Sequence, residues 1–251
     1  MLIWGVTTGL WLLLALPLLI LLFSGSGAPR GWRFGVMVSG ANLLLAIVLW
    51  GQVLSMPPMT APLISGVLRL TFVPATLMVL VNFLAWIIYR YSATNFRADA
   101  DSPRFLRWLT LTLFAVQILL LADHLVLFWM AWVAVSLSLH QLLMFYPNRA
   151  RAILAAHKKF LIGRCSEVVL GLALGLIYSV HHSLSMTAIL AQYPLASLPW
   201  QLQWAAVLLA MVALLKCAQL PLHGWLIQVV ESPTPVSALL HAGVINLGGV
   251  L

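Results

Sequence analysis

A lysine inside an apolar segment is the first residue of this sequence that could do chemistry. Lys216 lies in the stretch MVALLKCAQLP, five residues before Pro221. Proline removes a backbone hydrogen bond and disfavours a helical conformation of the preceding residue, so a helix is expected to break at Pro221. An amine beside such a break can gain and lose a proton, which suits a proton or cation path. The alternative is a static lysine that reaches polar surroundings or makes a fixed ion pair.

A histidine follows in the next polar stretch, ESPTPVSALLHAG. Pro233 and Pro235 are expected to open another helix, with Ser232 or Thr234 as its N-cap. His241 would then lie about two turns inside that helix. An imidazole titrates near neutral pH and suits a proton relay, although it could equally make a hydrogen bond to a neighbouring helix.

A carboxylate and a guanidinium are spaced to pair on one helical face. Arg164 precedes Glu167 by three residues within an apolar run, and side chains three apart are neighbours on a helix. The pair is either self-contained, or Glu167 also modulates Lys216 across a helix interface. Both interpretations remain open at this point.

Three further polar residues interrupt the apolar runs. Asp123 and His124 form an adjacent polar pair near the middle of the long run from Leu106 to Phe145, and the run is divided there into two spans. They are expected to mark a helix end at the membrane surface, with a place in the ion path as the alternative. His140, in SLSLHQLLMFY, either faces the interior of the helix bundle or bonds a neighbouring helix.

No motif of a soluble enzyme accompanies these residues. The sequence has no glycine-rich phosphate loop and no nucleophile elbow. Cys165 and Cys217 lack the spacing of metal ligands. We therefore expect neither a metal nor a cofactor in this chain, and transport rather than catalysis.

Composition places these residues in a membrane. Hydrophobic residues make up 63% of the 251 residues and charged residues only 7%, and several apolar runs reach the ~20 residues that a spanning helix needs. The sequence thus predicts an all-α, polytopic transmembrane bundle of about eight helices, the seventh broken by proline. The predicted spans are Leu2–Phe23, Phe34–Met56, Leu68–Tyr89, Leu106–Leu121, Leu125–Phe145, Phe160–Val180 and Leu202–Leu220, with an eighth helix from about Pro235.

The basic residues alternate between the predicted loops. The loops after the first, third and fifth spans hold Arg30, Arg33, Arg90, Arg97, Arg104, Arg107, Arg149, Arg151, Lys158 and Lys159. The loops after the second, fourth and sixth spans hold essentially none. The positive-inside rule then places the basic loops in the cytoplasm and the N-terminus outside. Membrane orientation accounts for the net charge of +8, so nucleic-acid binding is not expected.

The two proline-containing stretches carry a family resemblance. KCAQLPLHGWL followed by ESPTPVSALLHAG resembles the signature of the antiporter-like membrane subunits of respiratory complex I and Mrp cation antiporters, and LADHLVLFWMAW extends the likeness. The resemblance implies that Lys216 and His241 belong to a proton or cation path. It also implies that residues 1–251, which stop within an apolar stretch, form one transmembrane domain, the N-terminal half of a longer antiporter-like subunit.

One departure from that family points to a particular branch. The complex I and Mrp subunits have a glutamate after the tryptophan of their fifth helix, whereas here Val133 follows Trp132. Glu167 is the expected substitute for that carboxylate. With SLSLHQLLMFYPNRARAILAAHKKFL downstream, the chain is similar to the DabB branch, the membrane subunits of a two-component bacterial inorganic carbon transporter.

That likeness implies a partner and a location. DabB subunits work with DabA, a large cytoplasmic protein that resembles a zinc carbonic anhydrase, so zinc is expected in the partner and not in this chain. Downhill movement of H⁺ or Na⁺ through the membrane subunit would drive conversion of CO₂ to bicarbonate. The expected location is the bacterial inner membrane.

Two other functions compete with this hypothesis. The chain could be a proton- or sodium-translocating subunit of complex I or an Mrp antiporter, which uses the same Lys216 and His241. It could also be a structural membrane anchor with an inactive ion path, consistent with the absent carboxylate at Val133.

Overall fold

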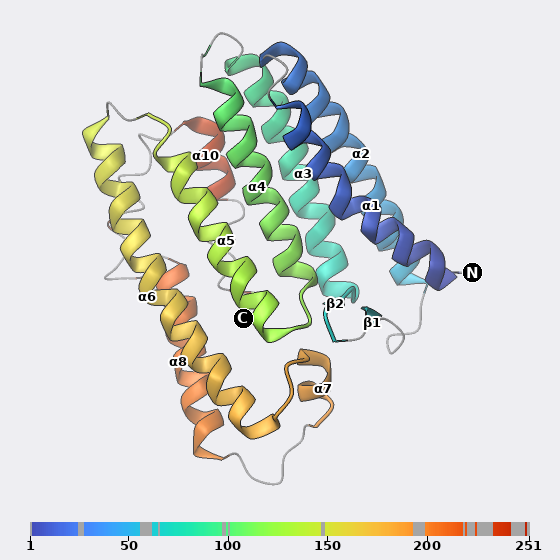
Figure 1. Cartoon of the computed structure of the whole chain (residues 1–251), viewed down its shortest axis with the longest axis vertical. Helices are drawn as coiled ribbons and strands as arrows, with labels where there is room; N and C mark the ends of the chain where they lie inside the picture. The colour runs from blue at the N-terminus through green and yellow to red at the C-terminus, as the bar shows by residue number, and fades with distance from the viewer. Residues whose placement is uncertain are drawn as a thin grey trace. The chain divides into compact units, whose positions relative to one another are not determined.

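The computed structural model of the chain describes residues 2–24, 28–55, 62–64, 66–96, 99, 101–146, 149–192, 199–217, 219, 224, 233–241 and 249. Nearly all of this part is helical (Figure 1). Contacts between Cα atoms divide the chain into two compact units, Met1–Leu121 and Ala122–Leu251. Each unit is described by itself.

Six of the described helices are long and apolar enough to cross a membrane. An α-helix satisfies all of its backbone hydrogen bonds internally, which the hydrocarbon core of a bilayer requires. The prediction of an all-α, multi-pass membrane protein is therefore confirmed. The six candidate spans are Gly5–Phe23, Arg30–Leu54, Phe72–Asn95, Ser102–Leu121, Leu125–Leu143 and Ala152–His181.

The first unit is a bundle of four long helices. They are α1 (Leu2–Phe23), α2 (Ala28–Leu54), α3 (Phe72–Asn95) and α4 (Ser102–Leu121). Helix α2 packs against α1 and α3, and α1 also packs against α4 (Figure 1). Between α2 and α3, the strands β1 (Pro62–Ile64) and β2 (Leu68–Arg69) pair antiparallel. Gly66, with φ of +80°, supplies the left-handed residue of their turn.

A buried amide cluster joins three helices of this unit. Asn82 Oδ1 accepts hydrogen bonds from Asn42 Nδ2 and Gln117 Nε2, each at 2.9 Å. The Nδ2 of Asn82 donates to the carbonyl of Met78 at 2.8 Å. Because buried amides need partners, the cluster fixes how α2, α3 and α4 are rotated against one another.

The second unit is built around the longest helix. Helix α6 packs against both α5 and α8, and α8 runs beside it (Figure 1). The helices of this unit are α5 (Leu125–Leu143), α6 (Ala150–His181), α7 (Met186–Leu190), α8 (Trp200–Lys216) and α10 (Thr234–Leu239).

The largest error in the predicted spans concerns α6. The span was expected to begin at Phe160, whereas the helix begins at Ala150 and runs for 32 residues, about 48 Å at 1.5 Å per residue. Its first turns read ARAILAAHKK, and alanine, arginine and lysine are strong helix formers. Polarity marks where a span meets water, but it does not end the helix. Lys158 and Lys159 therefore lie in α6 and not in a loop.

The start of α3 was also predicted wrongly. The predicted span began at Leu68, whereas Leu68 and Arg69 form β2 and α3 runs from Phe72 to Asn95. Arg69 thus adds one basic residue to the connection after α2. Arg30, Arg33, Arg104 and Arg107 lie in the first turns of α2 and α4, at the helix ends that face the basic side of this unit.

The other boundaries follow the predictions closely. The first span matches α1 at both ends, and α5 begins at Leu125 as expected. Helix α2 begins at Ala28 rather than at the predicted Phe34, and α4 begins at Ser102 rather than at the predicted Leu106. The short helix α7 was not predicted, because five residues are too few to give a periodic signal.

The proline-rich stretch is described only in part. Helix α8 ends at Lys216, with Cys217 as its C-cap residue, before Pro221, which lies outside the described residues. Pro233 is the N-cap residue of α10 and Pro235 lies in its first turn, so both prolines open the helix as predicted. Thr234, one of the two predicted N-cap residues, is instead the first residue of the helix. The other, Ser232, lies outside the described residues. Helix α10 ends at Leu239, so His241 lies just beyond it.

Candidate functional site

One face of α5 carries three polar or aromatic residues at a helical spacing. Trp132, Ser136 and His140 are four residues apart, so their side chains lie above one another. Trp132 and Ser136 are completely buried. The neighbouring Val133 offers no carboxylate, so the polar groups of this face are an indole, a hydroxyl and an imidazole.

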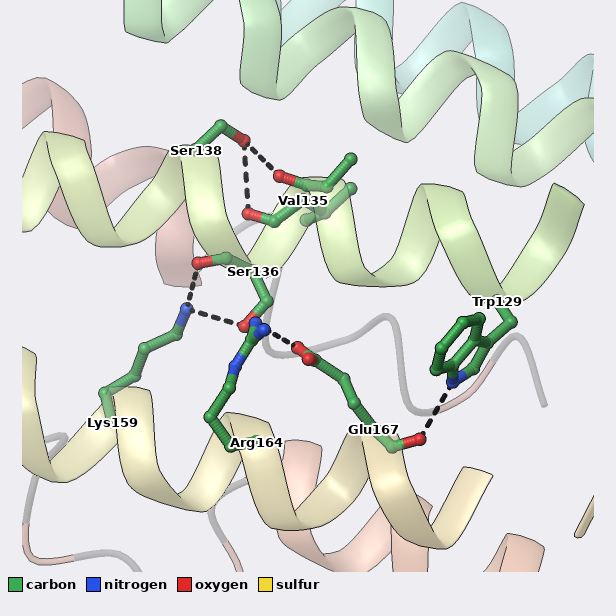
Figure 2. Close-up of polar contacts among 8 residues, drawn as sticks. Trp129, Val135, Ser136, Ser138, Lys159, Arg164 and Glu167 are labelled. Atoms are coloured by element: carbon green, nitrogen blue, oxygen red, sulfur yellow. Dashed lines mark hydrogen bonds and ion pairs between the residues drawn. The ribbon is translucent and has the colours of Figure 1, made fainter. Parts of the chain in front are cut away.

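A lysine of α6 reaches this face. The Nζ of Lys159 donates to the carbonyl oxygen of Ser136 at 3.1 Å and lies 3.5 Å from its hydroxyl oxygen (Figure 2). The side chain of Lys159 is buried. A buried ammonium or amine needs hydrogen-bond acceptors, and Ser136 provides two. Lys159 was predicted to orient the protein from a loop, and instead it belongs to a polar cluster between α5 and α6.

A glycine makes this approach possible. A Cβ atom added at Gly163 would lie 2.8 Å from Ser136 Oγ, closer than van der Waals contact permits. Gly163 lies four residues after Lys159, on the same face of α6. The serine on α5 and the glycine on α6 are therefore complementary.

The predicted ion pair is present one turn further along α6. Arg164 Nη2 donates to Glu167 Oε1 at 2.7 Å (Figure 2). The carboxylate is buried, whereas about a third of Arg164 is exposed. The guanidinium also lies over the ring of Phe160, 5.0 Å from its centroid. The indole Nε1 of Trp129 donates to the backbone carbonyl of Glu167 at 2.9 Å, which ties α5 to α6 at this level.

Lys216 ends α8 on the same face of α5. Its Nζ lies 4.7 Å from the ring centroid of Trp132, a cation–π geometry. The side chain is buried, and among the residues that the structure describes its Nζ has no hydrogen-bond partner. The ring of Trp132 is thus the contact that the described structure gives to the Lys216 amine.

These groups form one electrostatic unit. The charge of Glu167 acts on Lys159, Arg164 and Lys216, and the two lysines act on one another. Three basic groups thus face one carboxylate in surroundings of low polarity. Simultaneous protonation of both lysines is unfavourable because like charges repel strongly where water does not screen them. The protonation of one lysine therefore depends on that of the other.

His140 continues the cluster toward the start of α6. Its ring lies 4.7 Å from the centroid of Phe160 and 5.9 Å from that of His157. His140 Nδ1 is buried and has no hydrogen-bond partner among the described residues. The structure thus places His140 on the interior face of the bundle, and its hydrogen bond to the backbone of Ala156 in α6 also meets the other prediction, a bond to a neighbouring helix.

Asp123 lies in a different constellation. Its carboxylate accepts from Ser185 Oγ at 2.6 Å, and from Thr187 Oγ1 and the Thr187 backbone N–H at 2.6 and 3.0 Å. Asp123 therefore holds the first turn of α7, and it caps that helix rather than its own. His124 is the N-cap residue of α5, and its backbone bridges to Ser185. Both residues mark a helix end, as the sequence predicts.

One predicted path residue and the predicted helix break lie outside this cluster. His241 is exposed beyond the end of α10, and its part in a path stays a prediction. Pro221 lies outside the described residues. No group of three or more histidine, cysteine, aspartate or glutamate side chains in the described part of the chain is arranged to hold a metal ion.

An apolar cavity lies near the cluster. It has a volume of about 330 Å³ and lies between α5 and α6. Its lining residues include no charged side chain. Its lining includes Leu125, Val126, Trp129, Gly171, Leu174 and Tyr178.

Sequence reasoning missed Lys159 and Ser136. A usable signal was present, because Lys159, Gly163 and Glu167 recur every four residues and must share a helical face. That signal was hidden by counting Lys159 among the loop charges. The role of Ser136 had no such signal, since a serine within an apolar helix usually bonds its own backbone.

Comparison with known proteins places this geometry in context. Residues 122–251 match the family model described as NADH:quinone oxidoreductase/Mrp antiporter, TM. The chain is 42% identical over 246 residues to a probable inorganic carbon transporter subunit DabB of Hydrogenovibrio crunogenus, which covers 97% of this chain and 47% of that protein. It is also 37% identical over 264 residues to a probable inorganic carbon transporter subunit DabB2 of Halothiobacillus neapolitanus. That alignment covers 98% of this chain and 48% of the relative.

A respiratory protein is a more distant relative. NADH-quinone oxidoreductase subunit L of Mycobacterium tuberculosis is 31% identical over 258 residues, covering 96% of this chain and 41% of that protein. The chain spans about half the length of the curated relatives that it matches. The predicted likeness to DabB within the wider antiporter-like group is confirmed.

Proposed function

Because the chain belongs to the NADH:quinone oxidoreductase/Mrp antiporter transmembrane family, we propose that it is a membrane subunit of an energy-coupled inorganic carbon uptake complex. The observation that carries the proposal is the arrangement on α5. Val133 offers no carboxylate, whereas the ring of Trp132 contacts Lys216 and the carbonyl of Ser136 accepts a hydrogen bond from Lys159. The identity of 42% to a DabB subunit, against 31% to a complex I subunit, supports the same choice.

In this proposal the buried cluster conducts the coupling ion. Lys216 changes its protonation or its contact with Trp132, and Glu167 supplies the negative charge that favours the protonated lysine. His241 lies on the far side of the proline-rich stretch and continues the path. Downhill passage of H⁺ or Na⁺ drives hydration of CO₂ to bicarbonate by a DabA-like cytoplasmic subunit, which holds the zinc. The chain itself is a transporter subunit and not an enzyme.

The proposed location is the bacterial inner membrane, with the basic helix ends in the cytoplasm and the N-terminus outside. Arg149 at the start of α6 would then lie where a cytoplasmic partner can reach it. The positive-inside rule is the physical basis of this orientation.

A second candidate function is a proton- or sodium-translocating subunit of a complex I or Mrp assembly. The similarity to NADH-quinone oxidoreductase subunit L favours it, and Lys216 and Glu167 would serve the same path. A third is a structural anchor with an inactive path, which is compatible with the absence of a carboxylate at Val133.

Rescue of bacteria that lack carbonic anhydrase tests the proposal. The native gene that encodes this chain is expressed with that of its cytoplasmic partner, and growth in air and bicarbonate accumulation are measured with and without an uncoupler. We expect rescue that an uncoupler abolishes and that Lys216→Ala removes, while the partner still reaches the membrane.

The alternatives give different results in the same strains. Rescue that survives both Lys216→Ala and the uncoupler would identify an anchor. Absence of rescue, despite confirmed assembly at the membrane, would favour the respiratory or antiporter function.

A further inference from the structure

Two histidines lie between the exposed start of α6 and the buried lysines. His157 is exposed on α6, and His140 lies on the cluster face of α5. Their ring centroids are 5.9 Å apart, with the ring planes nearly perpendicular. This spacing is short enough for one bridging water. The path proposed above does not use either residue.

The hydrogen bond of His157 defines which nitrogen can take up a proton. Its Nδ1 lies 2.8 Å from the carbonyl oxygen of Ile153. A carbonyl only accepts, so Nδ1 carries the hydrogen and the neutral ring has its lone pair on Nε2. His157 is exposed, so Nε2 can receive a proton from solvent at this end of the helix.

His140 is placed to pass a proton between the buried lysines and His157. Its Nδ1 is buried without a hydrogen-bond partner among the described residues, and an unpaired buried nitrogen is costly unless it exchanges with a transient partner. The charged and titratable groups whose fields act on His140 are Lys159, His157 and Arg164. One turn along α5, the carbonyl of Ser136 accepts from Lys159.

We propose that His157 and His140 form the proton access route from the exposed start of α6 to Lys159. The inference rests on the proposed function and deepens it, because imidazoles carry protons and not sodium ions, so the coupling ion is H⁺. Each transfer conserves charge and atoms. In the downhill direction, from outside to the cytoplasm, the ammonium of Lys159 gives a proton to the free nitrogen of His140, which passes it to Nε2 of His157 and so to solvent, and Lys159 is left as a neutral amine that still lies against Ser136.

Proton flux in liposomes tests the route. The full-length protein with its cytoplasmic partner is reconstituted, CO₂ is supplied, and H⁺ movement is followed with an entrapped pH dye under an imposed potential. The variants are His140→Gln and His157→Gln, and the matched control is His182→Asn, an exposed histidine beyond the other end of α6. Since His157 is exposed, its variant should fold even if His140→Gln does not.

We expect each test variant to lose at least about tenfold in H⁺ flux, a typical contribution of a positioned proton-transfer group. Added imidazole should restore much of the flux to both variants, whereas His182→Asn should match the wild type. Rescue by a free imidazole is a result that a purely structural histidine would not give.

Four results would overturn the inference. Full flux in both variants, with flux lost in Lys216→Ala, would refute the route and leave the proposed function standing. Flux that is lost in the variants and that imidazole does not restore would also refute the route. A wild-type protein that is driven by Na⁺ without H⁺ movement would refute it as well. A wild type that moves neither ion would refute the proposed function together with the route.

Discussion

At the residue scale, the notable feature is that the two buried lysines have different partners. Lys159 donates to the carbonyl of Ser136, whereas Lys216 lies over the ring of Trp132 without a hydrogen bond among the described residues. A cation–π contact in desolvated surroundings contributes about 2 kcal/mol, and charge-assisted hydrogen bonds contribute a similar amount. Neither contact replaces full hydration, so both lysines remain able to release their protons.

Lys159 and its neighbour Lys158 give a matched pair of variants. Lys159 is buried against Ser136, whereas Lys158 is exposed on the same turn of α6. We expect Lys159→Met to reduce ion-coupled bicarbonate accumulation at least about tenfold, since one protonatable group of the cluster is lost. Lys158→Met should change it less than about twofold, as is usual for an exposed charge. Equal effects of the two variants would contradict a role for the buried amine.

At the scale of elements, α5 and α6 fit together through two close contacts at glycines of α6. The Gly163 position leaves room for Ser136 Oγ, and Trp129 packs in the same way over Gly171, where an added Cβ would lie 3.3 Å from the indole Nε1. Small residues let helices in a membrane approach closely. The close approach also brings Lys159 within reach of the carbonyl of Ser136.

Gly163→Ala tests this contact. The added methyl group would lie 2.8 Å from Ser136 Oγ, and overpacking of this kind costs about 1–3 kcal/mol. We expect a lower midpoint in a thermal unfolding assay in detergent, and recovery of the midpoint in the double variant with Ser136→Gly. Gly175→Ala is the control on the same helix, because nothing lies within 4 Å of its added Cβ. A midpoint unchanged by Gly163→Ala would refute the contact.

A second test concerns how α7 is held. Asp123 accepts three hydrogen bonds from Ser185 and Thr187, and hydrogen bonds to a charged group contribute about 1.5–3 kcal/mol each. We expect Asp123→Ala to increase hydrogen exchange at the amides of α7 by about 10- to 100-fold, with Thr187→Val giving a smaller increase. The amides in the middle of α5 should be unaffected. Unchanged exchange in α7 would show that its apolar contacts suffice to hold it.

At the scale of the whole molecule, the distribution of basic residues predicts the orientation in the membrane. Arg149 lies just before α6, and Ser183 lies just beyond its other end. In a background with Cys165→Ser and Cys217→Ser, we expect a membrane-impermeant maleimide to label Ser183→Cys in intact cells. Arg149→Cys should be labelled only after permeabilisation. The opposite pattern would place the N-terminus in the cytoplasm.

The sequence by itself determined the class of protein, most of the helices and one contact of the site. Apolar runs of about 20 residues predict spanning helices because a bilayer fixes their length, and α1 was located at both ends. The pairing of Arg164 with Glu167 was predictable because it depends only on the local spacing of a helix. The proline-containing stretches identified the family for the same reason, since a short motif is local.

Only the tertiary structure decided which residues complete the cluster. Lys159 and Ser136 are 23 residues apart, and Asp123 and Ser185 are 62 apart. Such contacts depend on how two helices are rotated and shifted against each other, and packing between helices sets that register. A sequence pattern reports the face of one helix but not the face that it meets. The place of Lys216 over Trp132, and of His140 beside His157, follows from that packing alone.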